Sequence, residues 1–397
     1  MLPFSLTTAT ELLNIYGSPL YVYRLDRLLD TIHHITNSIP YPDTQFQFAS
    51  VTNGNIALLQ VFKNNGWGIH ANTPGDIHLA LVAGFTPDRI VYSGSNLDRS
   101  EMRQILAWGI NAINLDSLSQ LETLAAVYSA EYPQPRLGLR LNFPPLTGES
   151  RIGVHPDEFD RANEIARRAG LTVAGLHFYR GTGTNATQAF TDAIEKILLL
   201  TSQLPDLTYL DFGGGFGYPY HHEKVAFDWV EFGRILSEKL SKLATKEIHL
   251  TIEPGRAAIA RSAVLLARVV AVKWQGEKQI LGVDSTVANL SVPSVHGGYR
   301  EIVSWQNSDE LFTTDVCGNT TYSRDYLGRN CQLPRLSIDD IIAIRDVGAY
   351  GYAMSSHFLH RPRPAEVLLT QDSHRLIRKR EDYSILLTNQ IFEEDRS

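Results

Sequence analysis

The stretch QFQFASV, residues 45–51, begins a series of β-type runs that decides the fold of this chain. Each run is rich in apolar or β-branched residues and is closed by small or polar residues, the pattern expected of buried strands. Seven further runs follow before residue 256. They are GIHAN (68–72), IVYSG (90–94), AINLDS (112–117), RLGLRLN (136–142), VAGLHFY (173–179), YLDFGGG (209–215) and EIHLTIEPG (247–255).

The segments between these runs have apolar residues at helical spacing, for example Ile56, Leu59 and Phe62 after the first run. Alternating strand and helix patterns predict parallel strands with helical crossovers. Eight such units favour a closed (β/α)8 barrel over an open sheet, so the predicted fold class is α/β.

The pattern changes after about residue 265 to short β-type runs such as AVLLARVVAVKW (263–274) and IIAIRDVG (341–348), separated by Gly, Pro and polar residues. This texture predicts a second, mostly β domain, and SPLYVYRL (18–25) is expected to join it as a strand. We therefore expect an N-terminal segment over 1–28 that joins the β domain, a barrel over 29–265 and a C-terminal β domain over 266–397.

Composition narrows the class of ligand and the compartment. The 397 residues include 36 Lys and Arg against 43 Asp and Glu, a formal net charge of −7, with no long basic run. This balance argues against a nucleic-acid or membrane partner and favours small-molecule or protein ligands. The sequence predicts no membrane anchor or secretory signal, so a cytoplasmic protein is expected. Cys317 and Cys331 are too widely spaced for a CxxC pair, and no His has metal-ligand spacing, so neither a disulfide nor a metal site is expected.

Barrels of this kind bind ligands at the C-terminal ends of their strands, so the residues that close the runs are the site candidates. The seventh run leads into GGGFG (213–217), whose backbone amides could form a cradle for phosphate. A tight turn is the alternative. The eighth run leads into Glu253 and Arg256, which could hold a heteroaromatic nitrogen and a phosphate or carboxylate, or could form a simple ion pair.

Two other candidates lie at the ends of other runs. Tyr179 ends the sixth run and could stack on a planar ligand or pack against the protein. His70 lies near the end of the second run and is a candidate for moving protons.

These pieces, in this order, resemble the fold-type III pyridoxal-phosphate decarboxylases, the group that contains diaminopimelate and ornithine decarboxylases. The resemblance covers nearly the whole chain. It lies in SPLYVYRLDRL (18–28), DFGGGFG (211–217), EPGR (253–256), DVGAYGYAM (346–354) and RPRPAEVL (361–368), and the diaminopimelate branch is the nearest in texture.

The resemblance implies an alanine-racemase-like barrel plus β domain that binds pyridoxal phosphate, and a homodimer with sites shared between the two chains. By position, Gly213, Gly214 and Gly215 with Arg256 and Tyr350 would hold the phosphate. Glu253 would bond the pyridine nitrogen, so that the ring can act as an electron sink. Thr182, in the GTG turn after Tyr179, is a further cofactor-binding candidate.

The departures from the family pattern fall on the chemistry itself. The lysine that anchors the cofactor corresponds to Val51, whose isopropyl group has no amine. The family's ring-stacking His corresponds to Tyr179, and the Cys of its partner-chain Cys-Glu-Ser segment corresponds to Thr321. The Arg that diaminopimelate decarboxylases use on the distal carboxylate corresponds to Val292, which puts that substrate in doubt. Lys63, which lies one helix after Val51, is a remote candidate to supply the missing amine.

Three hypotheses follow. The preferred one is a pseudoenzyme that keeps the phosphate and pyridine pocket but does not decarboxylate, and it predicts no carbon dioxide release from diaminopimelate, ornithine or lysine. The alternative is an enzyme of altered chemistry on an amino-acid-derived or phosphorylated small molecule, with pyridoxal phosphate bound non-covalently. Its protons would be moved by Tyr179, His70, Tyr322 or Asp325. The third is a plain decarboxylase with a lysine from elsewhere.

Overall fold

The structure is a computed structural model, and it describes residues 2–181, 183, 185–221, 223–242 and 248–391. The chain divides into two compact units. The barrel unit comprises Asp30–Pro219 and Val225–Ala258. The β unit comprises Met1–Leu29, Tyr220–Lys224 and Ile259–Ser397.

The barrel unit is built on a closed barrel whose eight strands pair in chain order, with β9 closing onto β2. Every pairing is parallel, so all the C-terminal strand ends meet at one mouth of the barrel. The strands are β2 (Thr44–Ala49), β3 (Gly68–Ala71), β4 (Ile90–Tyr92), β5 (Ala112–Leu115), β6 (Arg136–Arg140), β7 (Val173–His177), β8 (Tyr209–Asp211) and β9 (His249–Ile252).

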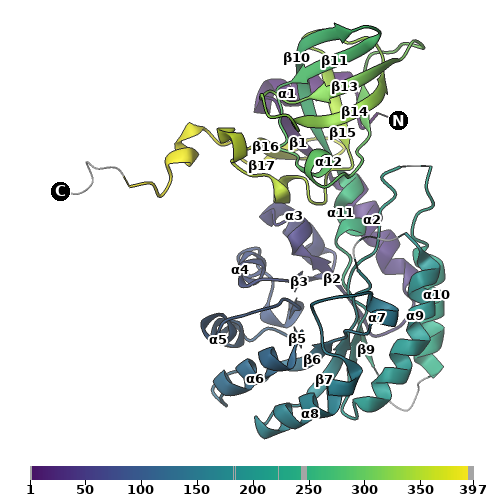
Figure 1. The fold of residues 1–397 in the computed structure, drawn as a ribbon, viewed down its shortest axis with the longest axis vertical. Helices are drawn as coiled ribbons and strands as arrows, with labels where there is room; N and C mark the ends of the chain where they lie inside the picture. The colour runs from purple at the N-terminus through teal and green to yellow at the C-terminus, as the bar shows by residue number, and fades with distance from the viewer. Residues whose placement is uncertain (1, 182, 184, 222, 243–247, 392–397) are drawn as a thin grey trace. The chain divides into compact units, whose positions relative to one another are not determined.

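Helices connect successive strands and surround them (Figure 1). They are α3 (Ile56–Asn64), α4 (Pro74–Val82), α5 (Arg99–Trp108), α6 (Leu118–Val127), α7 (Pro144–Thr147), α8 (Phe159–Arg168), α9 (Thr187–Leu200) and α10 (Trp229–Lys242), with α2 (Leu25–Ser38) before the first barrel strand. Local sequence sets their ends. Helix α5 begins after a capping box of Asp98 and Glu101 and ends at Gly109, which has the left-handed φ of +64°.

The helices present apolar side chains to the strands, as their spacing predicts. Leu58, Leu59 and Phe62 of α3 are fully buried, and the ring of Phe62 stacks on Phe48 of β2 at a centroid distance of 3.9 Å. Burial of such residues drives the helices onto the strands, because apolar area removed from water contributes about 25 cal/mol per Å². The predicted α/β barrel is therefore confirmed.

The β unit is a mostly β structure, as predicted. One sheet runs in the order β14-β13-β11-β10-β1-β16-β17, and β15 pairs with both β10 and β12. Its strands are β1 (Leu20–Arg24), β10 (Ala263–Gln275), β11 (Lys278–Val283), β12 (Ile302–Ser304), β13 (Phe312–Cys317), β14 (Tyr326–Leu333), β15 (Ile341–Arg345), β16 (Ala365–Leu369) and β17 (His374–Arg378).

The N-terminal strand β1 lies inside this sheet, antiparallel to β10 and parallel to β16. Helix α1 (Leu6–Tyr16) packs on the sheet through Leu12 and Leu13, which share an apolar cluster with Leu20 and Val22 of β1. The expectation that SPLYVYRL forms a strand of the β domain is confirmed. The two strands that flank β1 in the sheet, β10 and β16, come more than 200 residues later in the chain. The N-terminal strand therefore completes a sheet whose other strands come from the C-terminal part of the chain.

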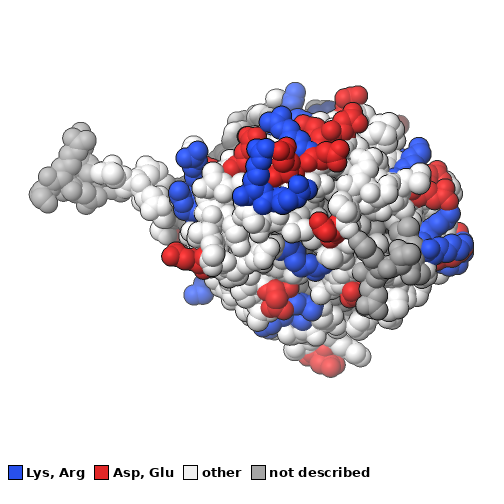
Figure 2. Space-filling view, turned by 90° about the horizontal axis from the view of Figure 1, so that it is seen from below, with Lys and Arg blue, Asp and Glu red and all other residues white. Residues whose placement is uncertain are grey.

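Within the described residues, no helix has the length and apolar character needed to span a bilayer. Acidic and basic side chains lie beside one another on the face drawn in Figure 2. Helix α10 carries pairs of this kind, with Arg234 contacting Glu231 at 2.8 Å and Glu238 at 3.4 Å. Such exposed pairs contribute little to stability and leave the surface without a field of one sign at that helix.

Candidate functional site

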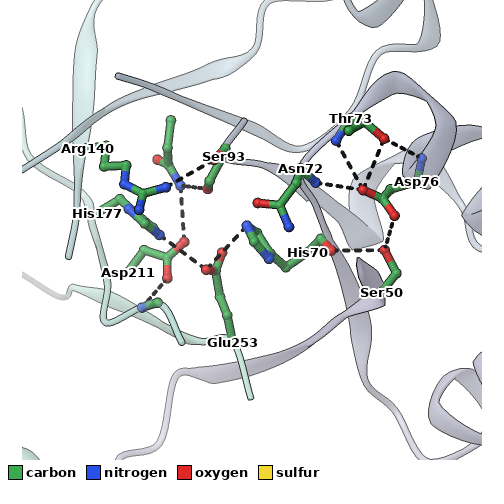
Figure 3. Close-up of polar contacts among 12 residues, drawn as sticks. Ser50, His70, Asn72, Thr73, Asp76, Ser93, Arg140, His177, Asp211 and Glu253 are labelled. Carbon is green, nitrogen blue, oxygen red and sulfur yellow. Dashed lines mark hydrogen bonds and ion pairs between the residues drawn. The ribbon is translucent and has the colours of Figure 1, made fainter. Parts of the chain in front are cut away.

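The candidate site is centred on Glu253, which follows the last barrel strand and is only 1% exposed. Strand β9 ends at Ile252, so the parallel barrel places Glu253 at the mouth where the other strands end. Figure 3 shows its carboxyl group among side chains from β3, β7 and β8. The Oε1 atom of Glu253 has no hydrogen-bond partner among the described residues.

Two histidines contact the other carboxyl oxygen of Glu253. The Nε2 atom of His177 lies 3.2 Å from Glu253 Oε2, and the Nε2 atom of His70 lies 3.5 Å from it. Burial lowers the pKa of His177 to about 4 and lowers the pKa of His70 well below its usual value. Both rings are therefore neutral at pH 7, and each can donate only one N–H.

Asp211 and Glu253 form a pair of adjacent buried carboxyl groups. Burial raises the pKa of Glu253 to about 7, although a hydrogen bond with Asp211 and the charge of Arg140 oppose the rise. Burial, followed by the nearby Glu253, raises the pKa of Asp211 well above its usual value. Because two such groups cannot both ionise at close range, the pair holds a proton near neutral pH. Asp211 is fixed by the amides of Gly213 at 2.8 Å and Asn114 at 3.1 Å.

Arg140 brings a positive charge to the same place. It ends β6, and its guanidinium lies 5.0 Å from the centre of the Tyr179 ring. Tyr179 is half-buried and lies against the glycine segment, because a Cβ added to Gly215 would be 3.5 Å from Tyr179 Cε2. The predicted candidates Tyr179 and Gly215 are therefore neighbours, while His70 approaches Glu253 from β3.

The glycine segment requires residues without side chains. Gly213 and Gly215 have φ of +56° and +92°, which only glycine adopts readily. A Cβ at Gly213 would lie 2.2 Å from the carbonyl of Phe178, and one at Gly214 would lie 2.8 Å from the carbonyl of Glu253. This close approach keeps the backbone of the segment at the mouth, next to Glu253.

Arg256 begins the short helix α11 (Arg256–Ile259) and is partly buried. Its Nε atom lies 3.2 Å from the position of a Cβ added to Gly183, so Arg256 lies beside the loop that follows Tyr179. Thr182, another predicted cofactor contact, lies outside the described residues. Glycine backbone and guanidinium thus occur at the ends of neighbouring strands, as a phosphate would require.

Val51 lies in a short 3-10 turn, Ser50–Thr52, directly after β2, and is 42% exposed. The turn is held by Ser50, whose hydroxyl donates to Asp76 at 3.0 Å. Lys63 is at the end of α3, and its Nζ lies 2.9 Å from a Cβ added to Gly84, in a connection that leads into β4. It therefore lies at the N-terminal end of the strands. Within the described part of the barrel unit, no lysine follows a barrel strand directly.

Three predicted residues belong to the β unit. Tyr350 has a positive φ of +59° in the connection after β15. Tyr322 packs edge-on against Phe358 at a centroid distance of 5.4 Å. Asp325 is 3% exposed, and its carboxyl oxygens accept hydrogen bonds from Val287 N, from Thr286 Oγ1, and from Thr320 N and Oγ1. In the β unit, therefore, the Asp325 carboxylate holds two segments together.

The same centre also offers donors for a cation. One ligand atom each from His177, Asp211 and Glu253 lie within 4.8 Å of one another, a grouping that spacing along the sequence did not suggest. The three residues come from three different strand ends, so only closure of the barrel brings them together. A metal and a heteroaromatic nitrogen would compete for the same oxygens of Glu253.

The sequence analysis did not select His177, Asp211 or Arg140 as site residues. A signal was present, because each is a polar residue at the end of a run of otherwise apolar strand residues. Burying such a group costs free energy unless a partner is supplied, so its position at the barrel mouth predicts a shared site.

The comparisons with known proteins agree with this geometry. The model of the family described as "Pyridoxal-dependent decarboxylase, pyridoxal binding domain" matches residues 25–260. A protein of Methanothermobacter thermautotrophicus named diaminopimelate decarboxylase is 34% identical, over 96% of this chain and 94% of that protein. One of Aquifex aeolicus with the same name is 28% identical, over 95% of this chain and 92% of that protein.

A solved structure supports the same relation. The crystal structure of diaminopimelate decarboxylase from Helicobacter pylori, complexed with L-lysine, has a TM-score of 0.86 and 27% sequence identity. The match covers 95% of this chain and 98% of that one. The likeness therefore includes the β unit as well as the barrel.

The preferred hypothesis of a non-decarboxylating pseudoenzyme is wrong. Similarity over nearly the full length to several proteins named diaminopimelate decarboxylase points to an active decarboxylase. The sequence argument was wrong because a substitution at one position removes one functional group and leaves the rest of the site intact. Valine at position 51 takes away an amine, but it leaves the buried Glu253 and the glycine segment in place. A missing amine is thus weaker evidence for lost activity than the sequence argument assumed.

Proposed function

This chain belongs to the pyridoxal-dependent decarboxylase family, and on that premise we propose that it decarboxylates an α-amino acid of the diaminopimelate type with pyridoxal phosphate held by non-covalent contacts. The observation that carries the proposal is Glu253. Its carboxyl group is buried at the barrel mouth. One oxygen lies 3.2 Å from His177 Nε2, and the other has no hydrogen-bond partner among the described residues. A buried carboxyl group of this kind is suited to an N–H of a planar heteroaromatic ligand.

The residues present fit pyridoxal phosphate. Glu253 would face the pyridine nitrogen, and the backbone of Gly213, Gly214 and Gly215, with Arg256, would bind the phosphate. The cofactor supplies an electron sink for the electron pair released when a carboxyl group leaves as carbon dioxide. Tyr179, which lies against Gly215, would contact the face of the ring in this proposal.

The chain's own acid–base groups support the role of Glu253. A negative charge on Glu253 favours a proton on the pyridine nitrogen, and the proton held by the Asp211–Glu253 pair is available at neutral pH. His177 and His70 are neutral, so they do not neutralise Glu253 by forming ion pairs. His70, whose two ring nitrogens have no hydrogen-bond partner among the described residues, is the candidate that moves a proton beside the ring.

Valine at position 51 defines how the cofactor is held in this proposal. An isopropyl group cannot bond to the cofactor's aldehyde, so the contacts of the pocket alone would retain the cofactor. The cofactor should then be removable by dialysis and replaceable by addition.

The experiment is an assay of carbon dioxide release. Purified protein is mixed with pyridoxal phosphate and, in separate reactions, diaminopimelate, lysine or ornithine. We expect release from diaminopimelate, loss of activity after dialysis and recovery when the cofactor is added back. The Glu253→Gln variant should lose at least about tenfold in rate, since it loses a charged hydrogen bond. Glu122→Gln is the matched control, because Glu122 is an exposed residue of helix α6 paired with Arg161.

Assays with a chelator distinguish pyridoxal phosphate from a metal ion bound by His177, Asp211 and Glu253. Activity unchanged by the chelator supports the pyridoxal phosphate proposal, and activity lost with the chelator and restored by a divalent metal contradicts it. No release from any of the three amino acids, under conditions where the cofactor binds saturably, would also overturn the proposal.

We also propose that the protein is a homodimer that shares its sites between chains, as the family resemblance implies. Tyr322 and Asp325 lie in the segment that this resemblance assigns to the partner's site. Sedimentation of the purified protein tests the proposal, and a monomer that retains full activity would contradict it.

A further inference from the structure

The β unit contains a pocket that none of the arguments above uses. It encloses about 510 Å³ and is formed entirely within the β unit, between the segment 293–300, which includes the end of helix α12 (Val292–Val295), and the residues 324–331 that lead into and form β14. The hydroxyl of Ser294 donates to the carbonyl of Arg324, which ties the two walls together.

Two glycines of the pocket wall lie close to other side chains. A Cβ at Gly298 would lie 2.6 Å from Val292 Cγ1, and one at Gly328 would lie 2.7 Å from both Cys331 Sγ and Ile302 Cδ1. A larger residue at either position would therefore have to displace its neighbours in the wall.

The charge of the pocket is of one sign. Arg300, Arg324 and Arg329 line it, and no Asp or Glu is among its lining residues. Arg324 and Arg329 are exposed, and among the described residues neither has a carboxylate within 4.0 Å. Two acidic residues are adjacent in sequence to arginines of the pocket. Asp325 is directed elsewhere, because its oxygens accept hydrogen bonds from Val287 and Thr320, and Glu301 pairs with Arg345.

Two of the guanidinium groups are held in place by aromatic rings. Arg329 lies over the ring of Tyr326 at 3.7 Å, and Arg300, which is 3% exposed, lies over the ring of Tyr220 at 3.6 Å. Stacking of this kind fixes the plane of a guanidinium group, and the exposed Arg329 can then turn its edge N–H groups toward a planar oxyanion. Arg300 donates one of its N–H groups to the carbonyl of Tyr299 at 2.7 Å. Tyr299, which is 44% exposed, and Tyr326 add aromatic surface beside the charges.

From these contacts we propose that the pocket binds a small molecule through a carboxylate or phosphate group, with Arg324 and Arg329 as the principal contacts and Arg300 as a buried third charge. Guanidinium groups pair with either oxyanion in two-pronged hydrogen bonds, which is the chemistry that the two ligand classes share. The inference concerns the β unit alone and does not depend on the proposed decarboxylation.

The experiment is calorimetric titration of the full chain at low salt with two probes, glutarate and inorganic phosphate. The test variant is Arg324→Ala/Arg329→Ala, and Arg375→Ala is the matched control, because Arg375 is an exposed arginine of β17 outside the pocket. Arg256→Ala accounts for any phosphate that binds in the barrel. We expect saturable binding of at least one probe, weakened about tenfold or more in the double variant and unchanged in Arg375→Ala. With phosphate as the probe, only the binding that remains in Arg256→Ala is assigned to the pocket.

Each outcome decides the question. Binding of glutarate alone assigns the pocket to carboxylates, and binding of phosphate alone assigns it to phosphate compounds. Either result supports the inference. Absence of binding by both probes, equal binding to the double variant, or phosphate binding lost only in Arg256→Ala would overturn it. Because the measurement is binding without pyridoxal phosphate or turnover, its failure is distinguishable from failure of the proposed function.

Discussion

The Nε2 atom of His177 lies 3.2 Å from the Oε2 atom of Glu253, and both side chains are about 1% exposed. His177 ends β7 and Glu253 follows β9, two strands that flank β8, and the residues are 76 positions apart in the chain. When Glu253 is ionised it can only accept hydrogen bonds, so the neutral His177 then donates its Nε2–H to Glu253 and fixes the direction of the carboxyl group. Four predictions follow from this centre and its surroundings.

Replacement of His177 should weaken the site through Glu253. In His177→Ala the carboxyl group loses its fixed donor, and we expect carbon dioxide release to fall about tenfold or more, the effect of losing one charged hydrogen bond. His177→Asn, which can still donate an N–H, should recover part of the loss. Full activity in His177→Ala would show that this contact does not position Glu253.

Glu253 should make stability depend on pH in an unusual direction. Its pKa is raised to about 7 by burial, so the folded protein binds more protons than the unfolded chain between about pH 4.5 and 7. The stability contributed by protonated Glu253 is present below that window and is lost as the pH rises through 7. Glu253→Gln stays neutral, so its stability relative to the wild type should increase from pH 5 to pH 8, by up to about 3 kcal/mol.

Urea denaturation of the two proteins at both pH values measures this difference, and the subtraction removes the titrations that the two proteins share. A relative stability that stays constant, or that decreases, between pH 5 and 8 would contradict the raised pKa.

Replacement of Gly215 by alanine should lower the free energy of unfolding by more than its positive φ alone explains, because the added Cβ has no room. Gly215 and Gly66 both have positive φ, +92° and +81°, but a Cβ at Gly215 would lie 2.5 Å from the carbonyl of Gly181, whereas nothing lies within 4 Å of one at Gly66. Gly66→Ala should therefore lose about 1 kcal/mol of unfolding free energy, and Gly215→Ala about 3 kcal/mol. Equal losses in urea denaturation would show that the segment shifts to make room.

Introducing an amine at position 51 should change how the cofactor is held. Val51 is 42% exposed in the turn after β2, so a longer side chain can be accommodated there. After borohydride reduction in the presence of pyridoxal phosphate, Val51→Lys should carry the cofactor covalently by mass spectrometry, and the wild type should not. Covalent labelling of the wild type at one lysine would show that another amine serves, and would overturn the non-covalent proposal.

Much of the fold could be predicted from residues alone. The eight runs between 45 and 255 correspond to strands β2 to β9, because a buried parallel strand needs a nearly continuous apolar run and the intervening helices need apolar spacing of 3.6 residues. The glycine segment after β8 was also visible, since close backbone approach excludes every other residue type. The same reasoning failed for activity, because it treated Val51 as the loss of the whole site.

The sequence by itself determined the alternation of strands and helices, the glycine segment 213–215, and a carboxylate at position 253 where the last barrel run ends. Only the tertiary structure decided which side chains meet that carboxylate. The barrel pairs β7 with β8 in the register His177 to Asp211, and β8 with β9 in the register Asp211 to Thr251. These registers carry His177 and Asp211 to Glu253 and make neutral forms favourable, because several ionisable groups share one buried volume. Spacing along a chain cannot encode this, since the groups become neighbours only when the barrel closes.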